Sequence, residues 1–283
     1  MRTSRWGIAA LGLLWIAFAG PAAAQDDARG QQLRDLAWKV EPAVGNIAGK
    51  ATLPLAGLRF LDPEPTNKFM ELTGNLPRTD SYVVGRKDLG WFAVLDFEAE
   101  GFVKDDEKID ADAYLKILKE GNQRSAEERK KRGLPGLTLE GWQLPPQYDS
   151  ANKRLEWATL LRTDGGEKIV NYSTKLLGRS GYTTATLVSD PQSFTSDVTE
   201  FKAAMNTVEY VPGEKYTEWK QGDKIAAYGL GALIVGGAAA VATKKGLWAV
   251  IAGFIGAFWK LIVGVAVAAV AGLGSLFKRN RQG

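Results

Sequence analysis

Three consecutive strands are predicted within residues 153–189, KRLEWATLLRTDGGEKIVNYSTKLLGRSGYTTATLVS. Alternate residues of the first segment share one side, namely Leu155, Trp157, Thr159 and Leu161, which is the period of a half-buried strand. Asp164-Gly165-Gly166 is typical of a tight turn. Because the connections are only a few residues long, we expect an antiparallel meander of strands over residues 153–162, 167–177 and 182–189.

Elements on both sides of the meander indicate an α+β domain. Residues 91–99 alternate as a further strand, and helix starts are expected at Asp62-Pro63, near Tyr114 and at Asp190-Pro191. Strands that follow one another without crossover helices favour this class over a doubly wound fold. The sequence therefore predicts an antiparallel sheet covered by two or three helices.

The C-terminal part of the chain is almost wholly apolar over residues 225–243 and 246–277, and each stretch is long enough to cross a ~30 Å membrane core. The predicted fold class is therefore an α+β domain followed by a C-terminal transmembrane helical hairpin. We expect a first span at 225–243, an interfacial or re-entrant segment at 247–259, a second span at 261–277 and a basic tail at 278–283. Two spans place this tail outside the cytoplasm, whereas a re-entrant second segment keeps it inside.

The N-terminal residues have the pattern of a secretory signal peptide. Arg2 and Arg5 precede a short apolar run, and small residues before Ala24 offer a cleavage site. An uncleaved anchor is the alternative interpretation. We expect a signal peptide at 1–24, an extracytoplasmic domain at 25–211 and a linker at 212–224, with Trp219 at the membrane interface. This places the protein in the cytoplasmic membrane, with its main domain in the periplasm or another extracytoplasmic space.

Composition excludes several classes of function. The chain has 36 basic and 32 acidic residues, but the excess of positive charge lies at the two ends, and residues 25–211 are mildly acidic. We therefore expect no nucleic-acid partner. With no histidine and no cysteine, the chain lacks the residues of a Ser-His-Asp triad, a thiol nucleophile or a His/Cys zinc site.

Carboxylates and lysines remain as candidate chemical groups. Five acids, Asp105, Asp106, Glu107, Asp110 and Asp112, precede the helix near Tyr114; they either stabilise its N-terminus or hold a hard cation, and their spacing does not match a calcium loop. Catalytic pairs among Asp96, Glu98, Glu140 and Glu156, or Lys175 beside Ser173, are further alternatives. We assign no catalytic, cofactor-binding or metal-binding residue, and no cofactor.

A group of aromatic and polar side chains is the best candidate for a surface that recognises a partner. It comprises Trp142, Tyr148, Asn171, Tyr172, Arg179 and Tyr182. Aromatic residues and arginine contribute much of the binding energy in protein interfaces. The alternative is structural: Trp142 and Tyr182 lie in the core and Arg179 occupies a turn.

Several ordered motifs resemble a bacterial family. They are Gly101-Phe102-Val103-Lys104-Asp105-Asp106, Gly141-Trp142 with Pro145-Pro146-Gln147-Tyr148-Asp149, Asn171 to Arg179 with Gly181-Tyr182, Pro212-Gly213-Glu214-Lys215-Tyr216 and Gly222-Asp223-Lys224. The family is an uncharacterised one of membrane-anchored proteins with a domain of unknown function, and the resemblance covers residues 38–277. It implies an exported domain with a C-terminal hydrophobic anchor and brings no known activity. The order of strands and helices also resembles the PsbP type of sheet domain, in fold alone.

These observations favour a membrane-anchored extracytoplasmic binding or scaffold protein over an enzyme. Its expected partners are the lipid bilayer and a protein of the envelope or membrane, and the anchor could form an oligomer. The alternative is a carboxylate-dependent envelope hydrolase or sugar-modifying enzyme. An enzyme of that kind needs a concave pocket where two or more carboxylates converge, whereas a binding module needs only a shallow aromatic patch.

Overall fold

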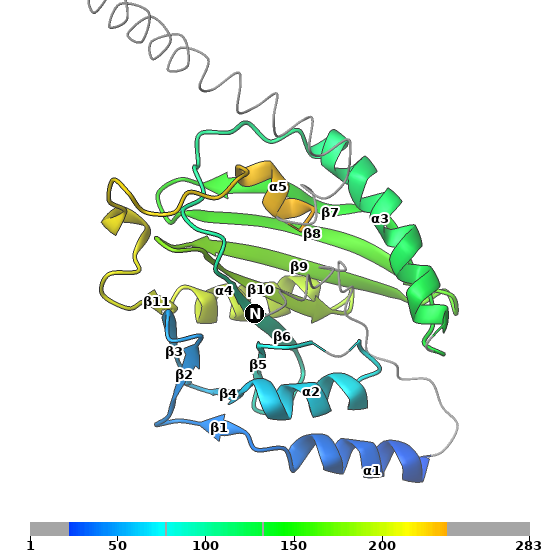
Figure 1. Cartoon of the computed structure of the whole chain (residues 1–283). Coiled ribbons are helices and arrows are strands. Elements are labelled where there is room, and N and C mark those ends of the chain that lie inside the picture. Colours follow the sequence, from blue (N-terminus) through cyan, green and yellow to red (C-terminus); the bar gives the residue numbers. More distant parts are fainter. Residues whose placement is uncertain (1–22, 77, 132, 237–283) are drawn as a thin grey trace, which may run out of the picture. The chain divides into compact units, whose positions relative to one another are not determined.

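The computed structural model describes residues 23–76, 78–131 and 133–236, all within one compact unit. A large antiparallel sheet dominates this unit, and a small sheet lies beside it (Figure 1). In spatial order, the large sheet contains β1 (Lys39–Val40), β4 (Leu58–Leu61), β5 (Ser81–Arg86), β6 (Phe92–Glu98), β10 (Tyr182–Ser189), β9 (Lys168–Leu177), β8 (Arg154–Thr163) and β7 (Leu137–Asp149). The small sheet contains β11 (Glu209–Tyr210), β3 (Ala51–Pro54) and β2 (Val44–Ile47).

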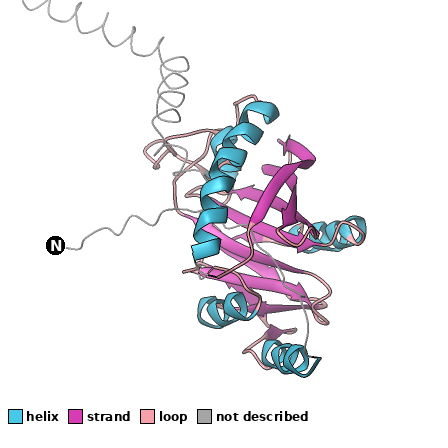
Figure 2. Ribbon diagram, turned by 90° about the vertical axis from the view of Figure 1, so that its right-hand side faces the viewer, coloured by secondary structure: helices cyan, strands magenta, loops and turns pink. Residues whose placement is uncertain are grey.

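Helices lie on both faces of the large sheet (Figure 2). They are α1 (Ala23–Arg34), α2 (Pro63–Leu72), α3 (Ala111–Lys131), α4 (Phe194–Met205) and α5 (Leu230–Ile234), with a short 3₁₀ turn η1 (Tyr216–Glu218). The long helix α3 packs on one face against β7, where the Asn122 side chain bonds the backbone of Leu137 and Leu139. Helix α4 covers the other face.

The predicted meander is confirmed. Strands β8, β9 and β10 pair antiparallel in sequence order, with Ser173 opposite both Trp157 and Thr186. The strand predicted over residues 91–99 is also present, as β6, and its Ala93 and Leu95 belong to the main core. Residues 137–149 form one continuous edge strand in spite of Pro145-Pro146, and the prolines fit because register shifts interrupt the pairing there.

The main core lies between the sheet and α4. Phe201 of α4 is fully buried, and its ring packs edge-on against Trp91 and Tyr172, with centroids 6.0 and 5.8 Å away. Smaller buried residues of the central strands, Ala158, Val170 and Ala185, leave room for these rings. This packing fixes the orientation of the central strands and of the turns that connect them.

Two of the predicted helix starts have different local chemistry. Helix α2 begins after Asp62 as expected, but the Asp62 side chain makes no capping bond; its carboxylate pairs with Lys39 at 2.5 Å. At the start of α3, Asp110 Oδ1 accepts a hydrogen bond from the Ala113 backbone N–H at 3.0 Å. This is the contact expected of an acid at a helix N-terminus.

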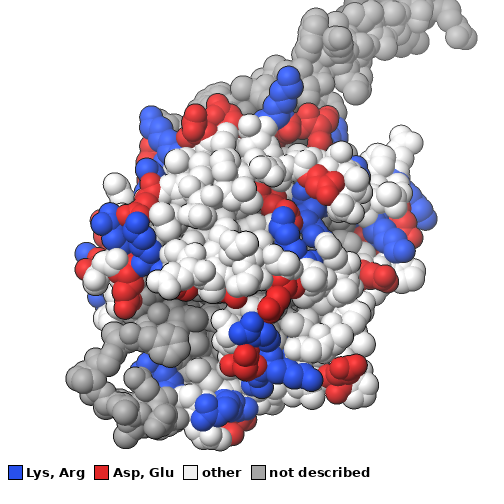
Figure 3. Space-filling model, turned by 180° about the vertical axis from the view of Figure 1, so that it is seen from behind, with Lys and Arg blue, Asp and Glu red and all other residues white. Residues whose placement is uncertain are grey.

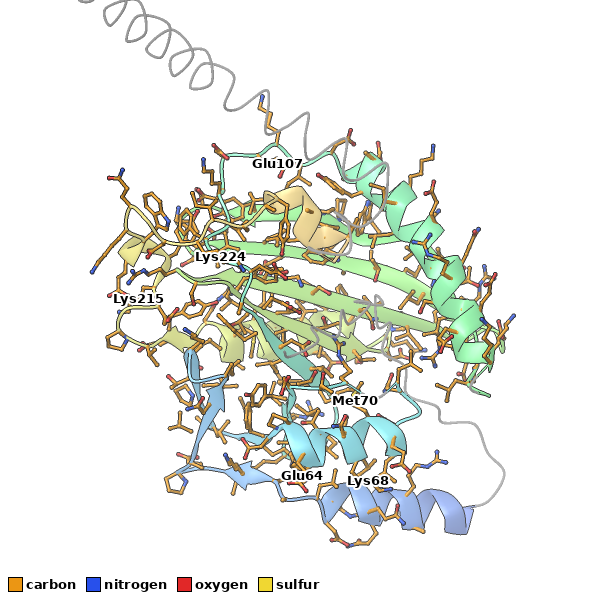
Figure 4. All side chains as sticks on the ribbon, in the orientation of Figure 1. Glu64, Lys68, Met70, Glu107, Lys215 and Lys224 are labelled. Atoms are coloured by element: carbon orange, nitrogen blue, oxygen red, sulfur yellow. The ribbon has the colours of Figure 1, made fainter. Side chains whose placement is uncertain are left out.

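The predicted fold class is wrong in its membrane part. No helix among residues 23–76, 78–131 and 133–236 is long and apolar enough to cross a membrane. The start of the expected first span belongs to the sheet domain instead: the Ala226 N–H donates to the Phe102 carbonyl at 2.9 Å, and α5 is five residues long and buried. Glu107, labelled in Figure 4, lies close to this helix. Its carboxylate accepts a hydrogen bond from the Gly231 N–H at 3.1 Å.

The membrane prediction failed here because an apolar run of sequence fits a segment buried in a protein as well as a segment that crosses a membrane. Ala226, Tyr228 and residues 230–235 are buried, and composition alone does not separate burial in a protein from contact with lipid. The remaining residues of the expected hairpin, including 247–259, 261–277 and the basic tail, lie outside the described residues. So do residues 1–22 of the predicted signal peptide.

The segment predicted to be a linker, residues 212–224, is folded onto the domain. The Tyr216 hydroxyl donates to the Val103 carbonyl at 2.9 Å, and Gly178 forms an antiparallel bridge with Lys215. The segment therefore carries side chains at fixed positions, next to the turn that connects β9 and β10.

Candidate functional site

The six side chains predicted to recognise a partner do not form one surface. Asn171, Tyr172 and Tyr182 are buried, with 3%, 0% and 3% of their area exposed. Tyr172 is part of the main core, whereas Asn171 and Tyr182 lie on the opposite face of the sheet. These three side chains are therefore interior residues. For Tyr182, this is the structural alternative given above.

The other three members lie at separate places. The Trp142 indole donates to the Ala111 carbonyl at 3.2 Å at the start of α3. The Tyr148 hydroxyl donates to Asp105 at 2.7 Å. Arg179 occupies the turn between β9 and β10, which is the structural alternative given for it above. Of the six residues, Arg179 alone lines the pocket described next. Partner binding by the other five remains a prediction.

A pocket of about 450 Å³ lies where the motifs that carry the family resemblance meet. We call it the motif-junction pocket. Its lining comes from four segments that are far apart in the sequence: Lys50, then Ala99 and Gly101, then Arg179 and Ser180, and finally Gly213, Glu214, Asp223 and Lys224. Lys224, close to the sheet, and Lys215, farther out on the same segment, are labelled in Figure 4.

Arg179 and Asp223 form a bidentate ion pair at this pocket. Two hydrogen bonds run in parallel, from Nε to Oδ2 at 2.7 Å and from Nη2 to Oδ1 at 2.8 Å. Nη1 of the same arginine donates to the Gly213 carbonyl at 3.2 Å. The hydrogen bonds from Arg179 lower the pKa of Asp223 to about 2, so this carboxylate is ionised at neutral pH.

Glu214 is held by two further residues of the pocket. Lys50 Nζ lies 2.5 Å from Oε1, and the Ser180 hydroxyl donates to Oε2. Burial opposes ionisation of Glu214, but the hydrogen bonds from Lys50 and Ser180 outweigh it and lower its pKa. Both carboxylates of the pocket are therefore charged and paired.

Backbone contacts hold the segments together beneath these side chains. The Gly101 N–H donates to the Ser180 carbonyl at 3.1 Å, and the Phe102 N–H donates to the Lys224 carbonyl at 2.8 Å. Gly101 has φ of +99°, and a Cβ there would lie 2.6 Å from the Lys224 carbonyl oxygen. Glycine is therefore required for this close approach.

An aromatic cluster of Phe102, Tyr216 and Trp219 comes from two of the segments that also line the pocket. The Phe102 ring stacks on Tyr216 with centroids 4.4 Å apart and lies 5.3 Å from Trp219. Trp219 is 38% exposed, which is unusual for so large an apolar side chain. The cluster therefore combines a fixed base with an accessible indole ring.

The acids that precede α3 have separate partners. Asp105 accepts hydrogen bonds from Tyr148 and from Lys153, the latter at 2.8 Å, while Glu107 contacts Tyr114 and α5. Among the described residues, no group of three or more acids converges as a metal site would require. Asp110 accepts a hydrogen bond at the start of α3, as the structural interpretation of these five acids expects.

The other candidate carboxylates are also divided between places. Glu140 pairs with Arg162 at 2.5 Å on β7 and β8, and Glu156 pairs with Lys202 of α4 at 2.8 Å. Asp96 accepts from Ser81 and pairs with Arg78 at 3.2 Å.

Lys175 is buried near Asp96 and Glu98 on the face of the sheet opposite the main core. Its ammonium donates to Thr184 Oγ1 at 2.7 Å, whereas Ser173 bonds Thr186. Burial lowers the pKa of Lys175 to about 8, against the attraction of Glu98 and Asp96, and burial raises the pKa of Glu98. A buried amine is thus present, but not the Lys–Ser pair that the sequence suggested.

Comparisons with known proteins give a family and no activity. The family model described as "Protein of unknown function (DUF2167)" matches residues 40–270. No curated protein matches the chain. A solution structure of cyanobacterial PsbP (CyanoP) from Synechocystis sp. PCC 6803 is similar at 10% identity with a TM-score of 0.35, covering 62% of this chain and 91% of that one.

Proposed function

The chain belongs to the DUF2167 family of proteins of unknown function, and on that premise we propose that it is a binding module. Its recognition site is the motif-junction pocket together with the aromatic cluster. The observation that carries this proposal is the convergence of four distant segments on one accessible pocket, and three of them contain residues of the family motifs or next to them. Pockets of this size with a few convergent polar groups are the usual sites of ligand and partner recognition.

The exposed indole of Trp219 supports recognition of a protein. An aromatic ring held by its neighbours loses little conformational freedom on binding, and such rings dominate protein interfaces. Trp219 rests on Phe102, which is fixed in turn by Tyr216. The cluster is therefore preorganised on the same segments that line the charged pocket.

The pairing of Glu214 and Asp223 favours binding over hydrolysis. Two carboxylates do line the pocket, as a glycoside hydrolase requires, but a general acid needs a raised pKa so that it carries a proton at neutral pH. The pKa values of both Glu214 and Asp223 are lowered. Neither group is suited to donate a proton.

The face in Figure 3 bears on the class of partner. Lys and Arg side chains lie among Asp and Glu around a large area without charged residues. This mixture differs from the continuous basic surface that nucleic acid binds. We propose a protein partner, met outside the cytoplasm if residues 1–24 act as the predicted signal peptide.

The proposal is tested by affinity capture of the full-length chain from its own cells, with captured proteins quantified by mass spectrometry. Trp219→Ser and Lys224→Glu should each reduce capture of the same partner at least tenfold. As controls at exposed positions of α3, Ile117→Ser also replaces a large apolar side chain by serine and Lys119→Glu repeats the charge reversal, and both should leave capture unchanged. Equal capture by all four variants would contradict the proposal.

A further inference from the structure

The motif-junction pocket has more positive than negative side chains. Lys50, Arg179 and Lys224 line it, against Glu214 and Asp223. Several charges of one sign around a concave surface attract ions of the opposite sign. The balance of charge therefore favours an anionic over a cationic ligand.

The two carboxylates have no oxygen left without a partner. The oxygens of Glu214 accept from Lys50 and Ser180. Both oxygens of Asp223 accept from Arg179, and Oδ2 also accepts from the Lys220 N–H at 2.7 Å. A cationic ligand would have to break these pairs, whereas an anion would leave them intact.

Lys224 has capacity for a further acceptor. Its Nζ donates to the Ala99 carbonyl at 3.2 Å, and an ammonium has three donors. Within the described part of the chain, no carboxylate lies within ion-pairing distance of this amine. The side chain is exposed, so a ligand in the pocket can reach it.

Glycine keeps part of the pocket wall free of side chains. Gly213 has φ of +89°, and the position of a Cβ there has no atom within 4 Å. A ligand can therefore approach the backbone next to Glu214 and Arg179. The pocket volume of about 450 Å³ admits a compact charged group.

Resting on the proposed function, we propose that the pocket binds an oxyanion, a carboxylate or a phosphate group carried by the partner. Lys224 is its principal contact, and the paired cations Lys50 and Arg179 add to the attraction. The paired acids hold these two cations at fixed positions. The aromatic cluster then contacts the part of the partner that bears the oxyanion.

The experiment titrates the purified full-length chain with sodium phosphate and with sodium acetate, at constant ionic strength set by sodium chloride. Isothermal calorimetry and the shift in unfolding temperature report binding. We expect saturable binding of at least one anion, weakened at least tenfold by Lys224→Gln and retained by Lys224→Arg. Lys220→Gln, which removes a neighbouring exposed lysine outside the pocket lining, should bind as the wild type does.

The preferred anion identifies the ligand class, since tighter acetate indicates a carboxylate and tighter phosphate a phosphate group. The inference is overturned if neither anion acts beyond chloride, or if Lys224→Gln binds as tightly as the wild type. Its failure is distinguishable from that of the proposed function. If no oxyanion binds but capture of a protein still depends on Trp219, the binding-module proposal is supported and the oxyanion site is not. If an oxyanion binds but no protein is captured through Trp219, only the oxyanion site is supported.

Discussion

The guanidinium of Arg179 binds the carboxylate of Asp223 through two parallel hydrogen bonds of 2.7 and 2.8 Å, across 44 residues of sequence. Arg179 lies in the turn between β9 and β10, and Asp223 lies at the end of the segment after β11. This pair joins that segment to the sheet, so residues 212–224 form a wall of the pocket and not a flexible tether.

Arg179→Lys should loosen this segment, because an ammonium cannot make two parallel hydrogen bonds to one carboxylate. We expect severalfold faster trypsin cleavage within residues 212–224 and a lower unfolding temperature. Arg162→Lys, which changes an exposed ion pair with Glu140, serves as control and should leave cleavage unchanged. Equal cleavage of both variants would show that the pair does not hold the segment.

The Arg179–Asp223 pair should make the free energy of unfolding depend on pH below about pH 4. The pKa of Asp223 is lowered from 3.8 to about 2 in the folded state, mainly by hydrogen bonds from Arg179. The unfolded state therefore binds the proton first, so the stabilisation is complete above pH 4 and is lost as pH falls toward 2. Urea unfolding of wild type and Arg179→Gln should give free energies that differ at pH 6 and converge near pH 2. A constant difference over this range would contradict the assignment.

Gly101→Ala should destabilise the floor of the pocket. Its φ of +99° is strained for alanine, and the added Cβ would meet the Lys224 carbonyl oxygen at 2.6 Å. We expect a loss of roughly 1–3 kcal/mol in the free energy of unfolding. Gly141→Ala has no atom within 4 Å of its new Cβ and should have little effect in the same urea titration. A Gly101→Ala protein as stable as Gly141→Ala would refute this close approach.

Lys175 should give the protein a rise in stability at alkaline pH. The pKa of its amine is lowered from 10.5 to about 8 by burial, although Glu98 and Asp96 attract the charge and Arg78 repels it. The folded state thus releases the proton first, and wild type should gain stability relative to Lys175→Met between pH 8 and 10.5, by up to about 3 kcal/mol. Lys168→Met, at an exposed lysine of the same strand, should show no such difference. A pH-independent gap for Lys175→Met would mean that the amine stays solvated.

The strands were predictable from sequence because their signal is local. Alternation in residues 153–162 and the short turn at Gly165-Gly166 report burial and connection within a few residues. Tyr172 shows the limit of that signal, since a tyrosine in a strand fits either face of a sheet equally well. Only the packing of Phe201, far along the chain, shows that Tyr172 belongs to the core.

The pocket could not be predicted because it depends on contacts between distant segments. Glu214 and Asp223 were within the quoted motifs, but nothing near them in the sequence points to Lys50 or Arg179 as partners. The same limit explains the error at residues 225–236, where Ala226, Tyr228 and residues 230–235 are buried. The sequence signal for the pocket is that charged residues recur next to glycine at 178–181, 212–214 and 222–224.

The most direct test of the central claim is site-specific photo-crosslinking in cells, with a photoreactive residue in place of Gln221, beside the pocket, or Thr195, exposed on α4. The account predicts a discrete crosslinked partner from position 221, absent from position 195 and lost when Lys224→Glu is added. The same partner from both positions, or a product at 221 that persists with Lys224→Glu, would contradict recognition at the motif-junction pocket.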